Sequence, residues 1–167
     1  MILSKNNSIY IGVDNGLNGA LAAIEPSYVH ELNVMPTIKS TKNKQEYNIH
    51  EVVEFFSRYP NATVIIEKAH AMPKLGSVQA FNFGKGFGTM MGIVAALKMK
   101  YHIVHAKTWQ KEMFKDINYT DTKQASAIVA QRIFPKLDFT ATERSKKIHD
   151  GMTDAILIAE YGQRMNL

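Results

Sequence analysis

The sequence predicts an α/β fold built on one mixed five-stranded sheet with helices on both faces. Two features predict it. Three strand-like stretches joined by short turns fill residues 8–34, and consecutive strands of this kind form an antiparallel meander. Beyond them, segments with the apolar spacing of helices alternate with short apolar runs. The expected order is therefore βββαβαβαα around one hydrophobic core.

The first three strands are expected close to the amino end. Residues 8–14 alternate between aliphatic side chains and others, which is the two-residue period of a strand. The sequence NGLNG that follows signals a turn. A second strand at residues 20–24 ends at Glu25 and Pro26, and a third covers residues 28–34.

The later elements follow from apolar spacing and from helix caps. They are expected as a helix over 49–56, a buried strand over 62–66, a long helix that begins at Ser77 or Gly84 and ends at Lys98, and a strand at Ile103 and Val104. Thr108 would cap a short helix ending at Phe114. Asp121 and Gln124 form a capping box for a helix that stops at Pro135, and the last helix covers residues 149–163.

Composition limits the classes of protein. Residues 1–167 are expected to form one domain. There is no cysteine, which excludes disulfides and thiolate chemistry, and the net charge of +5 suits a polyanionic partner. The sequence shows neither a signal peptide nor an apolar run that spans a bilayer. We therefore expect a cytoplasmic protein of a bacterial or phage-infected cell, with an organelle left open, that contacts no membrane and uses no small-molecule cofactor.

Four acidic residues stand beside apolar runs, where an unpaired carboxylate is costly. Asp14 and Glu67 end apolar strands, whereas Asp150 and Asp154 share one face of the last helix. Taken singly, each fits an ordinary role as a turn former, a solvated strand end or a charge at a helix start. Taken together on a βββαβ background, they indicate a site for Mg²⁺, which prefers oxygen ligands. Two such ions can hydrolyse a phosphodiester.

Four segments of the chain resemble one known family. They are IGVDNGLNGALAAI, VIIEKAHAMPKLGSVQAFNFGKGFGTMMGIVAAL, HAKTWQKEMF and HDGMTDAILIAEYG. Together they resemble the RuvC-like Holliday junction resolvases of the RNase H-like superfamily, in the branch shared by phage, bacterial and chloroplast proteins. The resemblance covers nearly the whole chain and implies the RNase H-like fold.

The resemblance also implies the site and the activity. The catalytic, metal-binding acids of the family fall on Asp14, Glu67, Asp150 and Asp154, and a functionally important lysine falls on Lys123. Another branch has a histidine where this chain has Gly151, so Asp150 is the expected ligand. The implied enzyme is a junction-resolving endonuclease that binds one or two Mg²⁺ ions per site, with Mn²⁺ as a substitute. Its substrate is branched DNA.

A homodimer is expected through the long helix. Gly84, Gly88 and Gly92 make one smooth stripe, which suits close packing either on the chain's own sheet or on a partner helix. The resemblance favours the partner helix. Two sites related by twofold symmetry would then cut the two strands of a four-way junction.

Basic and aromatic residues are candidates for DNA contact. They are Lys74, Phe81, Phe83, Lys85, Lys107, Lys111, Lys146 and Lys147. The two phenylalanines fit either base stacking from a loop or packing at the base of the long helix, in equal measure. Lys107 and Lys111 fit a solvated helix equally well. Trp109 is interpreted as a packing residue.

Three other functions compete with junction resolution. An RNase H acting on RNA–DNA hybrids would place its essential glutamate on the first helix, where this chain offers Glu51 or Glu54. An actin-like ATPase would need two such halves, and this length holds one. A DNA-binding module without catalysis is disfavoured because all four acids are present.

Overall fold

The computed structural model describes residues 8–42, 44–69 and 76–167. Five strands form one sheet in the order β3-β2-β1-β6-β7. Their bounds are β1 Tyr10–Asp14, β2 Ala20–Glu25, β3 Tyr28–Val34, β6 Thr63–Glu67 and β7 Lys100–Val104. The first three strands are antiparallel, whereas β6 runs parallel to both β1 and β7. The predicted mixed five-stranded sheet is confirmed.

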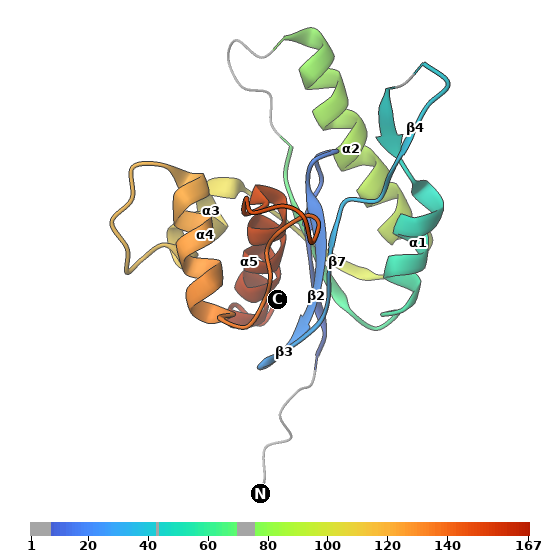
Figure 1. Ribbon diagram of the computed structural model, residues 1–167. Helices are drawn as coiled ribbons and strands as arrows, with labels where there is room; N and C mark the ends of the chain where they lie inside the picture. The colour runs from blue at the N-terminus through green and yellow to red at the C-terminus, as the bar shows by residue number, and fades with distance from the viewer. Residues whose placement is uncertain (1–7, 43, 70–75) are drawn as a thin grey trace, which may run out of the picture.

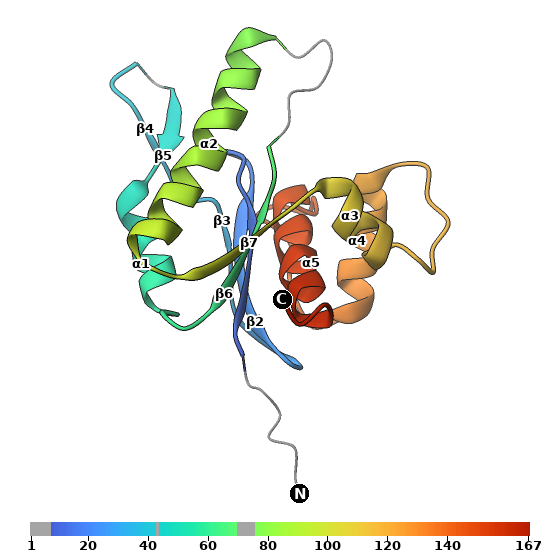
Figure 2. The ribbon, with the colours of Figure 1, turned by 180° about the vertical axis from the view of Figure 1, so that it is seen from behind.

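Helices cover both faces of this sheet, as Figures 1 and 2 show from opposite sides. One layer holds α1 (Ile49–Ser57) and α2 (Ser77–Ala96). The other holds α3 (Ala106–Met113), α4 (Thr122–Ile133) and α5 (Asp150–Arg164). Alternate residues of the strands enter the two layers, so that Ile11 and Val13 pack with α1 and α2 while Tyr10 packs with α5. The sheet is therefore buried on both sides, which explains its apolar central strands.

Helix α5 lies unusually close to strand β1. A Cβ atom on Gly12 would be 1.9 Å from the backbone oxygen of Ala155 and 2.5 Å from the backbone nitrogen of Ala159. Only a residue without a side chain permits this approach. The contact matters for the site, because it brings the start of α5 to the end of β1.

A small hairpin was missing from the sequence prediction. Strands β4 (Thr37–Lys39) and β5 (Gln45–Tyr47) pair with each other within a segment expected to be a polar loop. The strands are short and almost wholly exposed, so they carry no alternating apolar pattern. Tyr47 is their one buried residue and packs into the core.

Several element boundaries also differ from the predictions. Helix α2 begins at Ser77, so Phe81 and Phe83 lie on a helix and not in a loop. Helix α3 begins at Ala106 with His105 as its N-cap, which makes the predicted cap at Thr108 wrong. Three helices follow β7, as the separate helix predictions have it, although the predicted order βββαβαβαα counts only two. The cap at Asp121 is confirmed, since its carboxylate accepts the N–H groups of Lys123 and Gln124. In the part of the chain described here, no helix is long and apolar enough to span a bilayer.

Candidate active site

Two carboxylates meet at one edge of the sheet. Strands β1 and β6 are parallel, and their register pairs Val13 with Ile66. Asp14 and Glu67 follow these residues directly, so both lie at the carboxyl ends of neighbouring strands. Ligand sites of open α/β sheets lie at such ends. Local sequence places each acid at a strand end, and the parallel pairing brings the two together.

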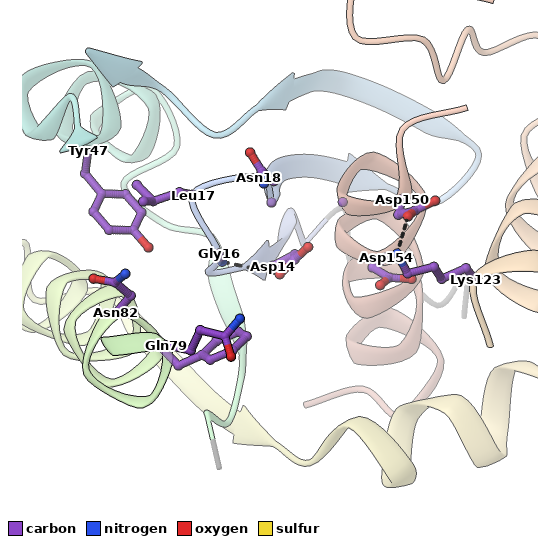
Figure 3. Close-up of a pocket in the computed structure, with 13 residues that line it drawn as sticks. Asp14, Gly16, Leu17, Asn18, Tyr47, Gln79, Asn82, Lys123, Asp150 and Asp154 are labelled. Atoms are coloured by element: carbon purple, nitrogen blue, oxygen red, sulfur yellow. Dashed lines mark hydrogen bonds and ion pairs between the residues drawn. The ribbon is translucent and has the colours of Figure 1, made fainter. Parts of the chain in front are cut away.

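Helices α5 and α4 contribute side chains to a pocket that Asp14 also lines. The pocket has a volume of about 460 Å³ and is shown in Figure 3. Asp14, Asp150, Asp154 and Lys123 line it, which brings together four of the five predicted catalytic residues. The fifth, Glu67, is close enough to repel both Asp14 and Asp154.

Burial and mutual repulsion make these carboxylates hard to ionise. Burial, followed by repulsion from Asp154 and Glu67, raises the pKa of Asp14 to about 7. Burial also raises the pKa of Asp154 to about 6, with further repulsion from Glu67 and Asp150. The pocket thus concentrates negative charge that a cation would neutralise.

Lys123 supplies a positive charge at the rim of the pocket. Its Nζ atom lies 2.8 Å from Oδ2 of Asp150, and this hydrogen bond raises the pKa of the lysine. The side chain is two-thirds exposed, at 67%. Lys123 stands in the first turn of α4, which the Asp121 cap fixes. The ammonium group can therefore reach both the acids and an incoming phosphate.

The surroundings of Glu67 were not anticipated. Nε1 of Trp109 donates a hydrogen bond to Oε2 of Glu67 at 2.7 Å, and Nδ2 of Asn15 donates to the Glu67 backbone oxygen at 2.6 Å. Trp109 was interpreted as a packing residue; it is fully buried, as expected, and it also holds a candidate ligand. Nothing in the local sequence links residues 42 positions apart.

Helix α2 and the hairpin close a second side of the pocket. The hydroxyl of Tyr47 donates to the Asn15 backbone oxygen at 2.8 Å. A Cβ atom on Gly86 would be 2.2 Å from that hydroxyl oxygen, so the glycine lets α2 lie directly on Tyr47. Gln79 and Asn82 of α2 also line the pocket, and sequence reasoning singled out neither. Figure 3 shows both residues on the α2 side of the pocket, across from Asp150, Asp154 and Lys123.

The predicted DNA-contact residues occupy different places. Phe83 lines the pocket, while Phe81 is 70% exposed, and neither belongs to the core. The alternative of core packing is therefore wrong for both. The five other lysines are exposed, and they lie on α2, on α3 and on the segment before α5: Lys85, Lys107, Lys111, Lys146 and Lys147. Lys74 lies outside the described residues.

The donor set suits a hard divalent cation. All four acids offer oxygen ligands, and the raised pKa values of Asp14 and Asp154 show that negative charge is crowded in the pocket. Within residues 8–42, 44–69 and 76–167, no three acidic or histidine side chains form a ready-made metal-binding group. A bound ion would therefore have to draw the carboxylates together. It would also have to displace Lys123 from Asp150.

The glutamates of the first helix do not join this site. Glu51 and Glu54 are exposed on α1, and Glu51 lines a separate depression with Pro36 and Thr140. An RNase H-type arrangement would need one of them beside Asp14. The acidic pocket instead uses Glu67 from the sheet.

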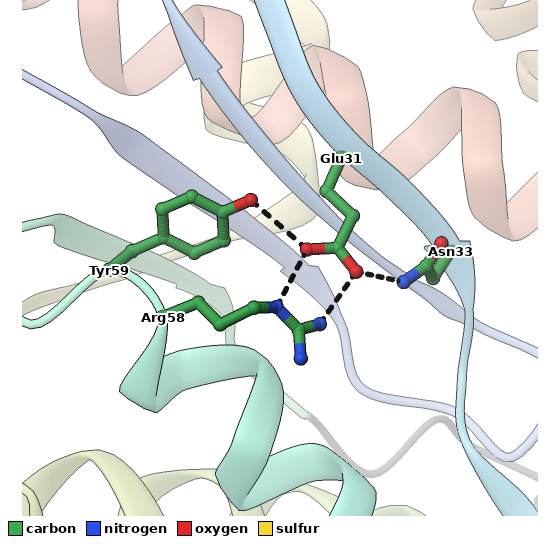
Figure 4. A network of polar contacts seen from close by, with 4 residues as sticks. All are labelled: Glu31, Asn33, Arg58 and Tyr59. Atoms are coloured by element: carbon green, nitrogen blue, oxygen red, sulfur yellow. Dashed lines mark hydrogen bonds and ion pairs between the residues drawn. The ribbon is translucent and has the colours of Figure 1, made fainter.

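A second polar cluster lies away from the pocket (Figure 4). Glu31 of β3 accepts hydrogen bonds from Arg58 at 2.6 and 3.0 Å, from Tyr59 at 3.0 Å and from Asn33 at 2.6 Å. These contacts join the end of α1 to the edge strand. The charges are paired within the cluster, so we assign it a structural role.

Comparisons with solved structures agree on the architecture. RuvC of T. thermophilus in complex with a Holliday junction substrate matches with a TM-score of 0.62 at 14% sequence identity, over 94% of this chain and 96% of that one. A second Thermus thermophilus RuvC structure gives a TM-score of 0.57 at 12% identity, over 95% and 96%. The yeast mitochondrial Holliday junction resolvase Ydc2 gives a TM-score of 0.63 at 12% sequence identity, over 95% of this chain and 78% of that one.

Comparison of the sequence alone finds no related family or protein. The chain matches no protein-family model, and no curated protein matches it. At 12–14% identity the structural matches establish the fold, and they do so across almost the whole chain. The chain therefore has the RuvC-like form of the RNase H-like α/β fold that its sequence motifs resemble.

Proposed function

We propose that this chain is a metal-dependent endonuclease that resolves Holliday junctions as a symmetric dimer. One observation carries the proposal. Asp14 and Glu67 stand side by side at the ends of two parallel strands, and Asp150 and Asp154 face them from α5. Crowded carboxylates of this kind are the ligands of two-metal phosphodiester hydrolysis. The likeness in fold to structures of junction resolvases supports the choice of substrate.

The residues of the pocket have distinct expected roles. Mg²⁺ ions, when bound, supply the charge that lowers the pKa of the attacking water and stabilises the leaving oxygen. The four acids Asp14, Glu67, Asp150 and Asp154 would hold the ions at the end of the sheet. Lys123, which pairs with Asp150 in this structure, would turn toward the scissile phosphate and stabilise the charge that develops on it.

The outer face of α2 supports the proposed dimer. Among the described residues, a Cβ atom on Gly84, Gly88 or Gly92 would meet no other atom within 4 Å, so the glycine stripe does not pack on the sheet there. Of the two alternatives that the sequence offered, this favours the partner helix. Phe81 lies on the same side as Gly88 and Gly92, since residues 7 and 11 positions apart share a helix face.

Gly92→Leu is expected to lower the dimer population at least about tenfold without unfolding the protein. The new side chain enters open space in the monomer but would stand between two closely packed helices. Sedimentation velocity across a concentration series measures the change. Gly76→Leu, which also enters open space but precedes α2, is the matched control. An unchanged dimer in Gly92→Leu, or a wild-type monomer at high micromolar concentration, would contradict the proposed interface.

Phe83→Ala is expected to slow cutting of a bound four-way junction about tenfold, whereas Phe81→Ala weakens junction binding. Stacking of a base on an aromatic ring contributes about 1–3 kcal/mol. Phe83 lines the pocket, while Phe81 points about 160° away around the helix axis. Single-turnover cutting and gel-shift titration separate the two effects. Tyr28→Ala, an exposed aromatic at the far end of the sheet, is the control. Normal cutting and binding by both variants would contradict a role of Phe81 and Phe83 in DNA contact.

The proposed activity is tested with a synthetic four-way junction and a linear duplex of the same sequence. We expect paired nicks in the junction that require Mg²⁺ or Mn²⁺ and disappear on chelation. The duplex should bind in a salt-dependent way but stay uncut. Cutting of both substrates at equal rates would show a nuclease without selectivity for branches.

A further inference from the structure

We propose that Trp109 is a positioning residue that orients Glu67 and thereby sets the affinity of the pocket for a divalent cation. This inference rests on the proposed function only in taking Glu67 as a metal ligand. It assigns a role in the site to the single tryptophan of the chain.

The contact between the two side chains is short, and its donor is buried. Nε1 of Trp109 lies 2.7 Å from Oε2 of Glu67, and no part of the tryptophan is exposed to solvent. An indole N–H is a donor only, and once buried it needs an acceptor. A hydrogen bond to a carboxylate at this distance belongs to the strong, charge-assisted class. Rotation of the Glu67 carboxylate would leave the indole N–H without this partner inside the core.

The indole is itself fixed by packing. Its ring meets Phe114 edge-on with centroids 5.7 Å apart, and Phe114 in turn meets Tyr119 at 5.2 Å. Trp109 belongs to the core that α3, α4 and α5 form on one face of the sheet. The donor therefore comes from a rigid element and can fix the direction of the carboxylate that it binds.

The backbone of Glu67 is held as well. Asn15, the residue after Asp14, donates from Nδ2 to the Glu67 backbone oxygen at 2.6 Å, and Asn15 is itself buried. In register, Glu67 is opposite Val104, and α3 begins directly after that strand. The neighbours on both sides of β6 thus position this glutamate, one through its main chain and one through its carboxylate.

The acidic surroundings explain why such a donor is needed. Asp14 and Asp154 repel Glu67, so an unrestrained carboxylate would turn away from them before any ion binds. Trp109 opposes this movement without adding a positive charge that would compete with the ion. Partners of this kind around metal ligands commonly change metal affinity by about 10–100-fold.

The test measures cation binding by the full-length protein without DNA. Mn²⁺ is titrated into wild type, Trp109→Phe and a protein in which Trp109 is replaced by benzothienylalanine, which keeps the bicyclic shape but lacks the N–H. We expect both replacements to weaken Mn²⁺ binding at least about tenfold, read by electron paramagnetic resonance. Val129→Ala removes apolar volume from the same core but changes neither Trp109 nor its ring partner Phe114, so it should lower thermal stability and leave Mn²⁺ affinity unchanged.

Tryptophan emission gives a second readout that packing alone would not move. Because Trp109 is the only tryptophan, Mg²⁺ should change the wild-type emission, and Glu67→Gln should remove that change. Unchanged Mn²⁺ affinity in the benzothienylalanine protein would overturn the inference and leave the nuclease proposal intact. If the two Trp109 replacements bind Mn²⁺ more weakly but the wild type cuts RNA–DNA hybrids and no junctions, the proposed function is overturned and the role of Trp109 stands. A wild-type protein that binds no cation at all would overturn both.

Discussion

Asp14→Asn is expected to abolish junction cleavage, with a loss of at least about 100-fold, while junction binding survives. The change removes the charge of a carboxylate that stands at the centre of the acidic pocket, beside Glu67 and opposite Asp154. It leaves untouched the exposed lysines that we propose as the phosphate contacts. Cutting is measured under single-turnover conditions, and binding by gel shift in Ca²⁺.

Asp116→Asn is the matched control for this experiment. It makes the same chemical change at an exposed position on the segment after α3, away from the pocket. We expect wild-type cutting from it. Residual cutting by Asp14→Asn within a few fold of wild type would show that the pocket is not the catalytic site. If junction binding is lost together with cutting, Asp14 is needed for the structure of the DNA-binding surface and not for catalysis alone.

Without divalent cations, the stability of the protein is expected to fall by about 3 kcal/mol between pH 5 and pH 8 through Asp14 alone. The pKa of Asp14 is about 7 in the folded protein and 3.8 for an unperturbed aspartate. Between these values the folded state binds more protons than the unfolded state, so the free energy of unfolding decreases as the pH rises. Asp154, with a pKa of about 6, acts in the same direction.

Denaturant unfolding at several pH values in a chelating buffer measures this slope. Asp14→Asn lacks the titrating group, so its stability should depend less on pH and should exceed that of wild type at pH 8. Mg²⁺ should raise wild-type stability at pH 8 and have little effect at pH 5, because it binds the ionised carboxylates. A wild-type curve that rises from pH 5 to pH 8 in the chelating buffer would contradict the electrostatic account of the pocket.

The main sheet and the four acids could be predicted because their signals are local. Strand alternation and apolar runs mark the five strands, and each acid stands conspicuously beside an apolar stretch. Gly12 shows what such local patterns miss. Its position under Ala155 brings α5 onto β1, yet in the sequence it is one glycine in a strand. The convergence of the acids could be inferred only from all four together on the predicted βββαβ order, and the family resemblance implied the same site.

The supporting residues were beyond prediction for the same reason. Trp109 and Tyr47 reach the site through contacts with residues 42 and 32 positions away, and the local sequence gives neither side chain a role there. The position of Phe81 and Phe83 stayed undecided because α2 mixes glycine and aromatic residues without a clear apolar face. The exposed hairpin was missed because its strands bury almost nothing.

A competition between two substrates tests the central claim most directly. A four-way junction and an RNA–DNA hybrid, carrying different fluorophores, are incubated together with wild-type protein and Mg²⁺. The ratio of kcat/KM for the two substrates is then read from one reaction, with Asp14→Asn as the blank. We expect the junction to be cut at least about 100-fold more efficiently, as paired nicks at symmetric positions. More efficient cutting of the hybrid would contradict the account and identify the acidic pocket as that of an RNase H-type nuclease.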